Sequence, residues 1–209
     1  MHSQGALPQY TNSADPTPYY MAAIEAMDFQ MNRLFNAIDP DELENTIIIF
    51  ITDNGTPNQV VQAPYDTRGA KGRLYQGGIN VPMVIAGNGV LRKGLENSLV
   101  TSTDLYSTIA DIAGVAEPDI NDSKSFKPLL RASSDHRTYQ YTELGSGDEA
   151  QWTISDGVYK MIERSNGNME LYKLSADPYE ETNLMRINLD MEASTALRLL
   201  QEELVRIRN

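Results

Sequence analysis

The chain has 209 residues, of which 17 are lysine or arginine and 29 are aspartate or glutamate, so its formal net charge is -12. This balance argues against nucleic acid or an anionic membrane as the main partner, because both repel an acidic protein. The absence of cysteine excludes disulfides and thiolate metal sites but leaves the compartment open. No secretory-signal pattern follows Met1, and no apolar stretch approaches the length of a membrane span.

The first predicted element is an amphipathic helix that follows a polar, proline-bearing loop at residues 1–17. Thr17 and Pro18 suit the N-cap and the first helical position. The apolar residues of this segment share one helical face: Tyr20, Ile24, Met27, Met31, Leu34 and Ile38. We expect this face to cover a sheet, with Glu25 and Asp28 solvated or structural rather than catalytic.

A strand is predicted at residues 46–52, after a short turn at Asp39-Pro40. Its run of isoleucine and phenylalanine suits a strand covered on both faces, as in a parallel sheet. Asp53-Asn54-Gly55 closes it, at the strand end where ligands of open α/β sheets collect. Carboxylate and carboxamide oxygens suit Ca²⁺ or Mg²⁺. The alternative is that the triplet forms only a turn, because Asn-Gly readily takes positive φ.

A glycine-rich loop with one lysine follows at residues 69–78. Its glycines let backbone approach a ligand closely, and the Lys71 ammonium is a suitable point charge for a sulfate or phosphate oxygen. A solvated loop lysine is the alternative. Residues 81–86 predict a second strand, and Leu99-Val100 a weak third. So few central strands indicate part of a larger doubly wound sheet rather than a complete one.

The middle of the chain predicts a second, shorter helix. Residues 104–113 are expected to form this helix, which Thr103 caps and Gly114 ends. Asp104 is expected to be a first-turn acid favoured by the helix dipole. His136 is expected in an exposed loop.

From about residue 138 the pattern changes to a small antiparallel sheet followed by a helix. Three short segments separated by hairpin signals predict the strands: 151–155, 157–163 and 169–174. Apolar residues between positions 189 and 207 then share one helical face. The sequence therefore predicts two parts, an α/β part at 1–137 and a small α+β subdomain at 138–209.

Taken in order, these segments resemble the second half of the sulfatases, a branch of the alkaline phosphatase superfamily. The resemblance rests on Ile51 to Gly55, on Gly69 to Pro82, and on three stretches that agree in order and spacing: Tyr20 to Asp28, Thr103 to Val115 and Glu170 to Leu184. It covers nearly the whole chain. The implied fold is α/β: part of an alkaline-phosphatase-like mixed or parallel sheet with flanking helices, plus a small C-terminal antiparallel sheet and helix.

The resemblance also implies site residues. In the family, the aspartate and asparagine of the Asp-Asn-Gly segment bind the active-site divalent cation, which implies Asp53 and Asn54. That cation is usually Ca²⁺, with Mg²⁺ or Mn²⁺ as alternatives. The lysine of the Lys-Gly-x-x-Tyr segment contacts the sulfate, which implies Lys71 as the substrate-binding and catalytic residue. Gln76 stands where glutamate is common and Asn80 where arginine is common, and both departures bear on substrate preference.

The nucleophile of the family is missing from this chain. Sulfatases use a formylglycine made from a Cys/Ser-x-Pro-x-Arg segment, and no such segment occurs here. In the family it lies well before the Asp-Asn-Gly strand, whereas only 52 residues precede Asp53. The resemblance therefore implies a fragment that is inactive alone, with the formylglycine expected in a missing N-terminal half. His2 lacks the family's His-x-Pro context and stays unassigned.

The predicted function is that of a metal-dependent hydrolase of sulfate esters, acting on a small molecule or a glycan. Two alternatives stay open: a phosphonate or phosphate ester hydrolase of the same superfamily, and a non-catalytic anion-binding or interaction module. Asn54 disfavours the first, because phosphatase branches commonly carry histidine there. An exposed sheet edge would favour pairing with a missing half or a second copy.

Overall fold

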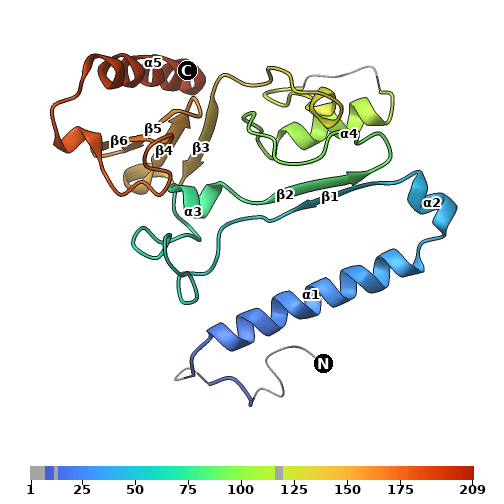
Figure 1. Cartoon of the computed structure of the whole chain (residues 1–209). Helices are drawn as coiled ribbons and strands as arrows, with labels where there is room; N and C mark the ends of the chain where they lie inside the picture. The colour runs from blue at the N-terminus through green and yellow to red at the C-terminus, as the bar shows by residue number, and fades with distance from the viewer. Residues whose placement is uncertain (1–7, 12–13, 116–119) are drawn as a thin grey trace.

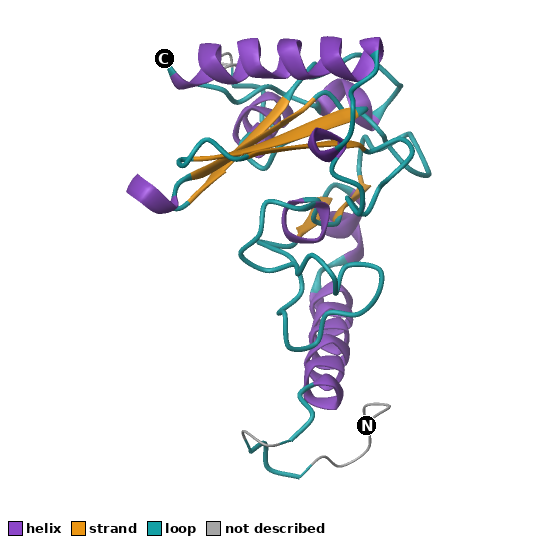
Figure 2. Cartoon of the chain, turned by 90° about the vertical axis from the view of Figure 1, so that its left-hand side faces the viewer, coloured by secondary structure: helices purple, strands orange, loops and turns teal. Residues whose placement is uncertain are grey.

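The computed structural model describes residues 8–11, 14–115 and 120–209 (Figure 1). A two-stranded sheet lies near the middle of the molecule, with a short helix on one side of it and a long helix reaching away on the other. A four-stranded sheet with the C-terminal helix forms a separate layer (Figure 2). Among the described residues, no helix is both long and apolar enough to cross a bilayer.

Helix α1, Thr17–Ala37, confirms the predicted amphipathic helix but begins one residue earlier than expected. Pro16 is its N-cap, so Thr17 is the first helical residue rather than the cap. None of the residues of α1, which lies wholly in a described range, is buried. Five of its large apolar side chains are exposed, among them Ile24, Met27 and Leu34 of the predicted apolar face, and Figure 1 shows the helix apart from both sheets. The expectation that α1 covers the sheet is therefore wrong for the described chain. Helix α2, Pro40–Glu44, replaces the predicted turn.

The central strands are β1, Ile47–Ile51, and β2, Met83–Gly87. They pair antiparallel, with Ile49 opposite Ile85, rather than in the parallel setting that the apolar run favours. All of β1 is half-buried, because its described sheet holds only these two strands. The predicted third strand is reduced to a single bridge between Leu99 and Arg137.

Two helices connect the central strands to the rest of the chain. The one-turn helix α3, Gln76–Ile79, precedes β2, and α4, Asp104–Ile112, confirms the predicted second helix. A 3-10 helix, Lys127–Leu130, follows. Phe126 and Leu129 form a small core there with residues of β2 and α4, so α4 packs over the central pair (Figure 1).

The C-terminal sheet has four antiparallel strands in chain order. They are β3, Gln140–Leu144; β4, Gln151–Ser155; β5, Tyr159–Arg164; and β6, Met169–Lys173. Two short 3-10 helices accompany them, Gly147–Glu149 and Leu184–Arg186. The three predicted strands are confirmed, and β3 at the edge is an addition.

Helix α5, Met191–Arg208, lies along one face of this sheet (Figure 2). Asp190 caps it by accepting a hydrogen bond from the Ala193 N–H at 2.8 Å. The main core forms between helix and sheet, and its fully buried members include Ile154, Met161, Leu171, Leu200 and Leu204. The domain boundary at residue 137 stays a prediction.

Candidate functional site

The Asp-Asn-Gly turn is fixed against helix α3 by backbone bonds. The N–H of Gly55 donates to the carbonyl oxygen of Gly78 at 3.1 Å. A Cβ on Gly55 would lie 2.0 Å from the Gly77 carbonyl oxygen, so only glycine allows this approach. Asp53 is exposed and Asn54 is half-buried at the carboxyl end of β1. Asp53 is therefore open to solvent while the turn that carries it is held.

The lysine loop lies beside the same turn. The N–H of Lys71 donates to the carbonyl oxygen of Thr56 at 3.0 Å. The exposed side chain of Asn58 holds the loop: it accepts a hydrogen bond from the Ala70 N–H at 2.8 Å and donates one to the Lys71 carbonyl oxygen at 3.3 Å. Gly69 and Gly72 have positive φ of 71° and 73°, so the loop turns sharply on both sides of Lys71. The structure thus brings the segments of Asp53, Asn54 and Lys71 together, and their roles remain predictions.

The donor chemistry of the turn fits a hard cation only in part. Asp53 and Asn54 offer a carboxylate and a carboxamide oxygen, whereas Ca²⁺ takes about six to eight oxygens. Within the described ranges, no group of three or more His, Cys, Asp or Glu side chains is arranged to hold a metal ion. Any cation held here would need further oxygens from water, from a bound anion or from another segment.

The lysine loop also docks on the C-terminal sheet through aromatic side chains. The Tyr75 hydroxyl donates to Glu170 at 2.9 Å, and the Tyr172 hydroxyl donates to the same carboxylate at 2.8 Å. Burial acts to raise the pKa of Glu170, but these hydrogen bonds and the Arg164 guanidinium, 2.9 Å away, lower it overall. Burial, with the adjacent Glu170, raises the pKa of Tyr172. Glu170 is therefore a charged anchor for the loop.

Arginine side chains gather where the loop meets the sheet. Arg68 lies over the rings of Tyr75 and Tyr172, 5.3 and 5.7 Å from their centroids. Arg68, Arg73 and Arg164 line a cavity of about 270 Å³ between loop and sheet. This corner carries positive charge in a chain whose net charge is strongly negative.

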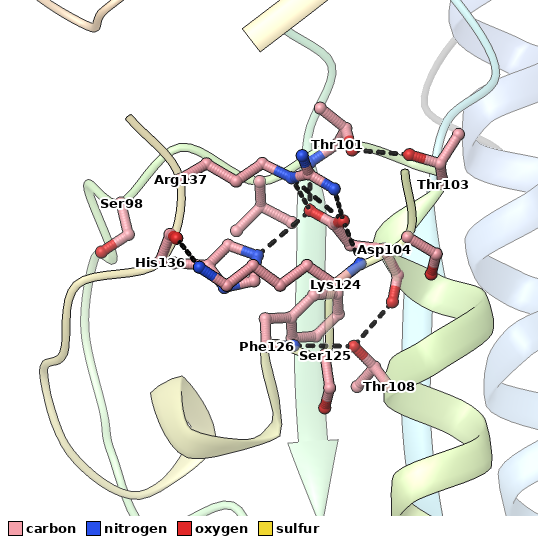
Figure 3. Close-up of polar contacts among 12 residues, drawn as sticks. Ser98, Thr101, Thr103, Asp104, Thr108, Lys124, Ser125, Phe126, His136 and Arg137 are labelled. Carbon is pink, nitrogen blue, oxygen red and sulfur yellow. Dashed lines mark hydrogen bonds and ion pairs between the residues drawn. The ribbon is translucent and has the colours of Figure 1, made fainter. Parts of the chain in front are cut away.

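A buried polar cluster surrounds Asp104 (Figure 3). Asp104 is fully buried and accepts hydrogen bonds from the Thr101 N–H at 3.0 Å and the Lys124 N–H at 2.9 Å. Its carboxylate also pairs with Arg137, and the His136 Nε2 atom lies 3.1 Å from Oδ2. Burial acts to raise the pKa of Asp104, but the Arg137 bond and the backbone donors outweigh it and lower the pKa to about 2.

This cluster corrects one prediction and extends another. His136 is only 9% exposed, so the exposed loop expected there is wrong. Asp104 does lie in the first turn of α4, but side-chain and backbone partners hold it in addition to the helix dipole. The physical reason is that the segment after residue 122 folds back over the start of α4 and brings its basic residues to the carboxylate.

Sequence reasoning missed the acidic residues that hold the lysine loop from the C-terminal sheet. They are Glu170, described above, and Glu180, whose Oε2 atom accepts from the Gln76 N–H at 2.5 Å. Both lie inside the Glu170 to Leu184 stretch that carries the resemblance. That stretch was the available signal, but the sequence does not show which of its residues contact the loop.

Comparison with known proteins gives two overlapping family matches. The model described as Sulfatase matches residues 2–115, and the model described as N-sulphoglucosamine sulphohydrolase, C-terminal, matches residues 65–209. A sulfatase of Formosa agariphila is 31% identical over 198 residues, covering 81% of this chain and 35% of that protein. Arylsulfatase K of Xenopus laevis is 27% identical over 185 residues, and the match covers 81% of this chain and 34% of that protein. The chain thus spans about a third of the length of these relatives.

Solved structures agree on the fold. A protein solved in complex with its substrate D-glucosamine-2-N,6-O-disulfate has a TM-score of 0.72 at 24% identity, and the match covers 89% of this chain and 40% of that protein. Phosphonate monoester hydrolase of Agrobacterium radiobacter has a TM-score of 0.70 at 21% identity, and the match covers 91% of this chain and 40% of that protein. At these identities the likeness establishes the fold, which confirms the predicted mixed α/β class.

Proposed function

This chain belongs to the sulfatase family, and we propose that it supplies the cation-binding turn and the sulfate-binding lysine of a sulfate ester hydrolase. Its curated relatives include arylsulfatases and a steryl-sulfatase. One observation carries the proposal: the backbone bond from Lys71 to Thr56 holds the lysine loop beside the turn of Asp53 and Asn54. A cation and an ammonium group could therefore act on one anionic group.

Each proposed residue has a distinct task. Asp53 and Asn54 would hold a divalent cation through hard oxygen donors, with Ca²⁺ first and Mg²⁺ or Mn²⁺ as alternatives. When bound, the cation would neutralise negative charge on the sulfate oxygens. Lys71 would donate hydrogen bonds to a sulfate oxygen and stabilise charge that develops there. The bonds of Asn58 would keep the loop in one conformation while it does so.

The proposed substrate is a sulfated small molecule or glycan. The cavity lined by Arg68, Arg73 and Arg164 supports an anionic ligand, because guanidinium groups pair well with sulfate and carboxylate oxygens. The structural neighbour solved with a disulfated glucosamine is consistent with the glycan choice.

We further propose that the 209 residues alone do not hydrolyse esters. The sequence contains no cysteine and no Ser-x-Pro-x-Arg segment from which a formylglycine could be made. The nucleophile would come from another segment of a longer protein or from a second polypeptide, paired through an exposed sheet edge.

Titration of sulfate into the chain tests the role of Lys71. The Lys71→Ala variant should bind sulfate at least about tenfold more weakly, because it loses a charge-assisted hydrogen bond. Lys93→Ala removes another exposed loop lysine and is the matched control, which should bind like the parent chain. Equal sulfate affinity of the Lys71→Ala variant and the parent would refute the proposal.

Two alternative functions give different results. A phosphonate or phosphate ester hydrolase, whose fold is shared by the Agrobacterium neighbour, should prefer methylphosphonate or phosphate over sulfate in the same titration. A non-catalytic anion-binding module should bind sulfate through Lys71 but without any dependence on a divalent cation. Sulfate preference with cation dependence supports the hydrolase.

A further inference from the structure

A buried ion pair in the C-terminal subdomain reaches the candidate site. Lys160, in β5, and Glu180, in the loop after β6, are each 1% exposed, and their Nζ and Oε1 atoms lie 2.6 Å apart. The second carboxylate oxygen of Glu180 accepts a hydrogen bond from the Gln76 N–H, the first residue of α3. One side chain thus joins the C-terminal sheet to the loop that follows Lys71.

The backbone around Glu180 is strained into the conformation that makes this contact. Glu180 has φ of 61°, which a non-glycine residue adopts only where the surroundings enforce it. Asp177 enforces it here: its carboxylate accepts the N–H groups of Glu181 and Thr182, and its carbonyl accepts the N–H of Glu180. Such strain at a buried, charged residue points to a function for the contact.

Helix α3 is the element through which this contact acts on the site. The carbonyl oxygen of Gly78 accepts the bond from Gly55, next to Asn54. A Cβ on Gly78 would lie 2.1 Å from the Arg73 carbonyl and 2.4 Å from the Ala70 carbonyl, so the lysine loop wraps tightly round α3. A shift of α3 would therefore move both the cation turn and Lys71.

We propose that Glu180, held by Lys160, is a positioning residue that fixes α3 and thereby sets the place of Lys71 beside the Asp53-Asn54 turn. This proposal rests on the proposed function of Lys71. The pair does not itself contact the ligand. Its burial lowers the pKa of Lys160, against the effect of Glu180, so removing either partner alone would leave an uncompensated charge. The test must therefore change both residues together.

Two double variants separate positioning from stability. Both remove the two charges: K160M/E180Q keeps a carbonyl acceptor for the Gln76 N–H, whereas K160M/E180M removes it. Neither variant leaves a lone buried charge, so both should unfold in urea near the parent. The exposed pair Arg198–Glu202, 2.7 Å apart on α5, provides the control R198M/E202M.

The readouts are amide hydrogen exchange of Gln76, relative to Leu171 in β6, and sulfate affinity of the 209-residue chain. In K160M/E180M we expect the amide of Gln76 to exchange about tenfold faster, because one buried hydrogen bond is lost, while the exchange rate of Leu171 stays unchanged. We also expect the dissociation constant for sulfate to rise about tenfold. K160M/E180Q and R198M/E202M should resemble the parent in both.

The outcomes decide between positioning and packing. Parent-like Gln76 exchange in K160M/E180M would overturn the proposal. So would faster exchange with unchanged sulfate affinity, provided that Lys71→Ala weakens binding. If Lys71→Ala has no effect, the proposed function fails instead, and Gln76 exchange alone then decides whether Glu180 fixes α3.

Discussion

The charge of Asp104 should stabilise the fold by an amount that can be measured from its pH dependence. The folded pKa is about 2 and the model-compound value is 3.8. Each pKa unit corresponds to about 1.4 kcal/mol, so the difference is worth about 2 kcal/mol of folding stability. Because the folded pKa is depressed, this stability is fully present above about pH 4 and is lost as the pH falls through about 2. Asp104 is fully buried, so solvent screens it little.

The Asp104→Asn variant isolates this contribution. At pH 7 it should lower the free energy of unfolding by about 3 kcal/mol, because Arg137 loses its buried partner. Urea unfolding, followed by the fluorescence of Trp152, should then show that the gap to the parent closes between pH 4 and pH 2. Asp66→Asn, at an exposed loop position, is the control and should stay within about 0.5 kcal/mol. A difference in unfolding free energy that stays constant with pH would show that the Asp104 charge does not stabilise the fold.

Three further substitutions test the close approach at Gly55, the Tyr75 hydrogen bond and the C-terminal core. Gly55→Ala would place a Cβ 2.0 Å from the carbonyl oxygen of Gly77 in α3, so sulfate binding should be lost. The amides of β6 should keep their protection from hydrogen exchange. Retained sulfate binding would contradict the close approach. Tyr75→Phe removes the bond to Glu170 and should cost about 1 kcal/mol in urea unfolding; no loss would mean that water replaces it. Leu200→Ala should lower the free energy of unfolding by about 2–5 kcal/mol, whereas Leu199→Ala, at a partly exposed position, should lower it far less. Equal losses would contradict the assignment of Leu200 to the core.

Local patterns predicted the elements that carry the site. The predicted strand at 46–52 is found as β1, which ends at Ile51, two residues before Asp53, and the glycines around Lys71 do form a tight loop. Helix α5 and strands β4 to β6 likewise follow from periodicity and hairpin signals, because these features depend on neighbouring residues. Strand β3, Gln140–Leu144, was missed because it lies at a sheet edge, has no fully buried residue and mixes polar with apolar side chains.

Contacts between distant segments could not be predicted in this way. Asp104 and His136 are 32 positions apart, and Gln76 and Glu180 are 104 positions apart. The residue types in these pairs do not reveal that the partners are in contact, because only the path of the folded chain brings them together. The same limit applies to α1: its apolar face is evident from the sequence, but the sequence does not show what it contacts.

The central claim is that the Asp53-Asn54 turn and Lys71 act on one anion, and the coupling between Ca²⁺ and sulfate tests it most directly. Sulfate affinity would be titrated with and without saturating Ca²⁺, in the parent chain and in the Asp53→Ala variant. We expect Ca²⁺ to tighten sulfate binding by at least about fivefold in the parent and to have no effect in the variant. Sulfate affinity in the parent that does not change with Ca²⁺ would contradict it.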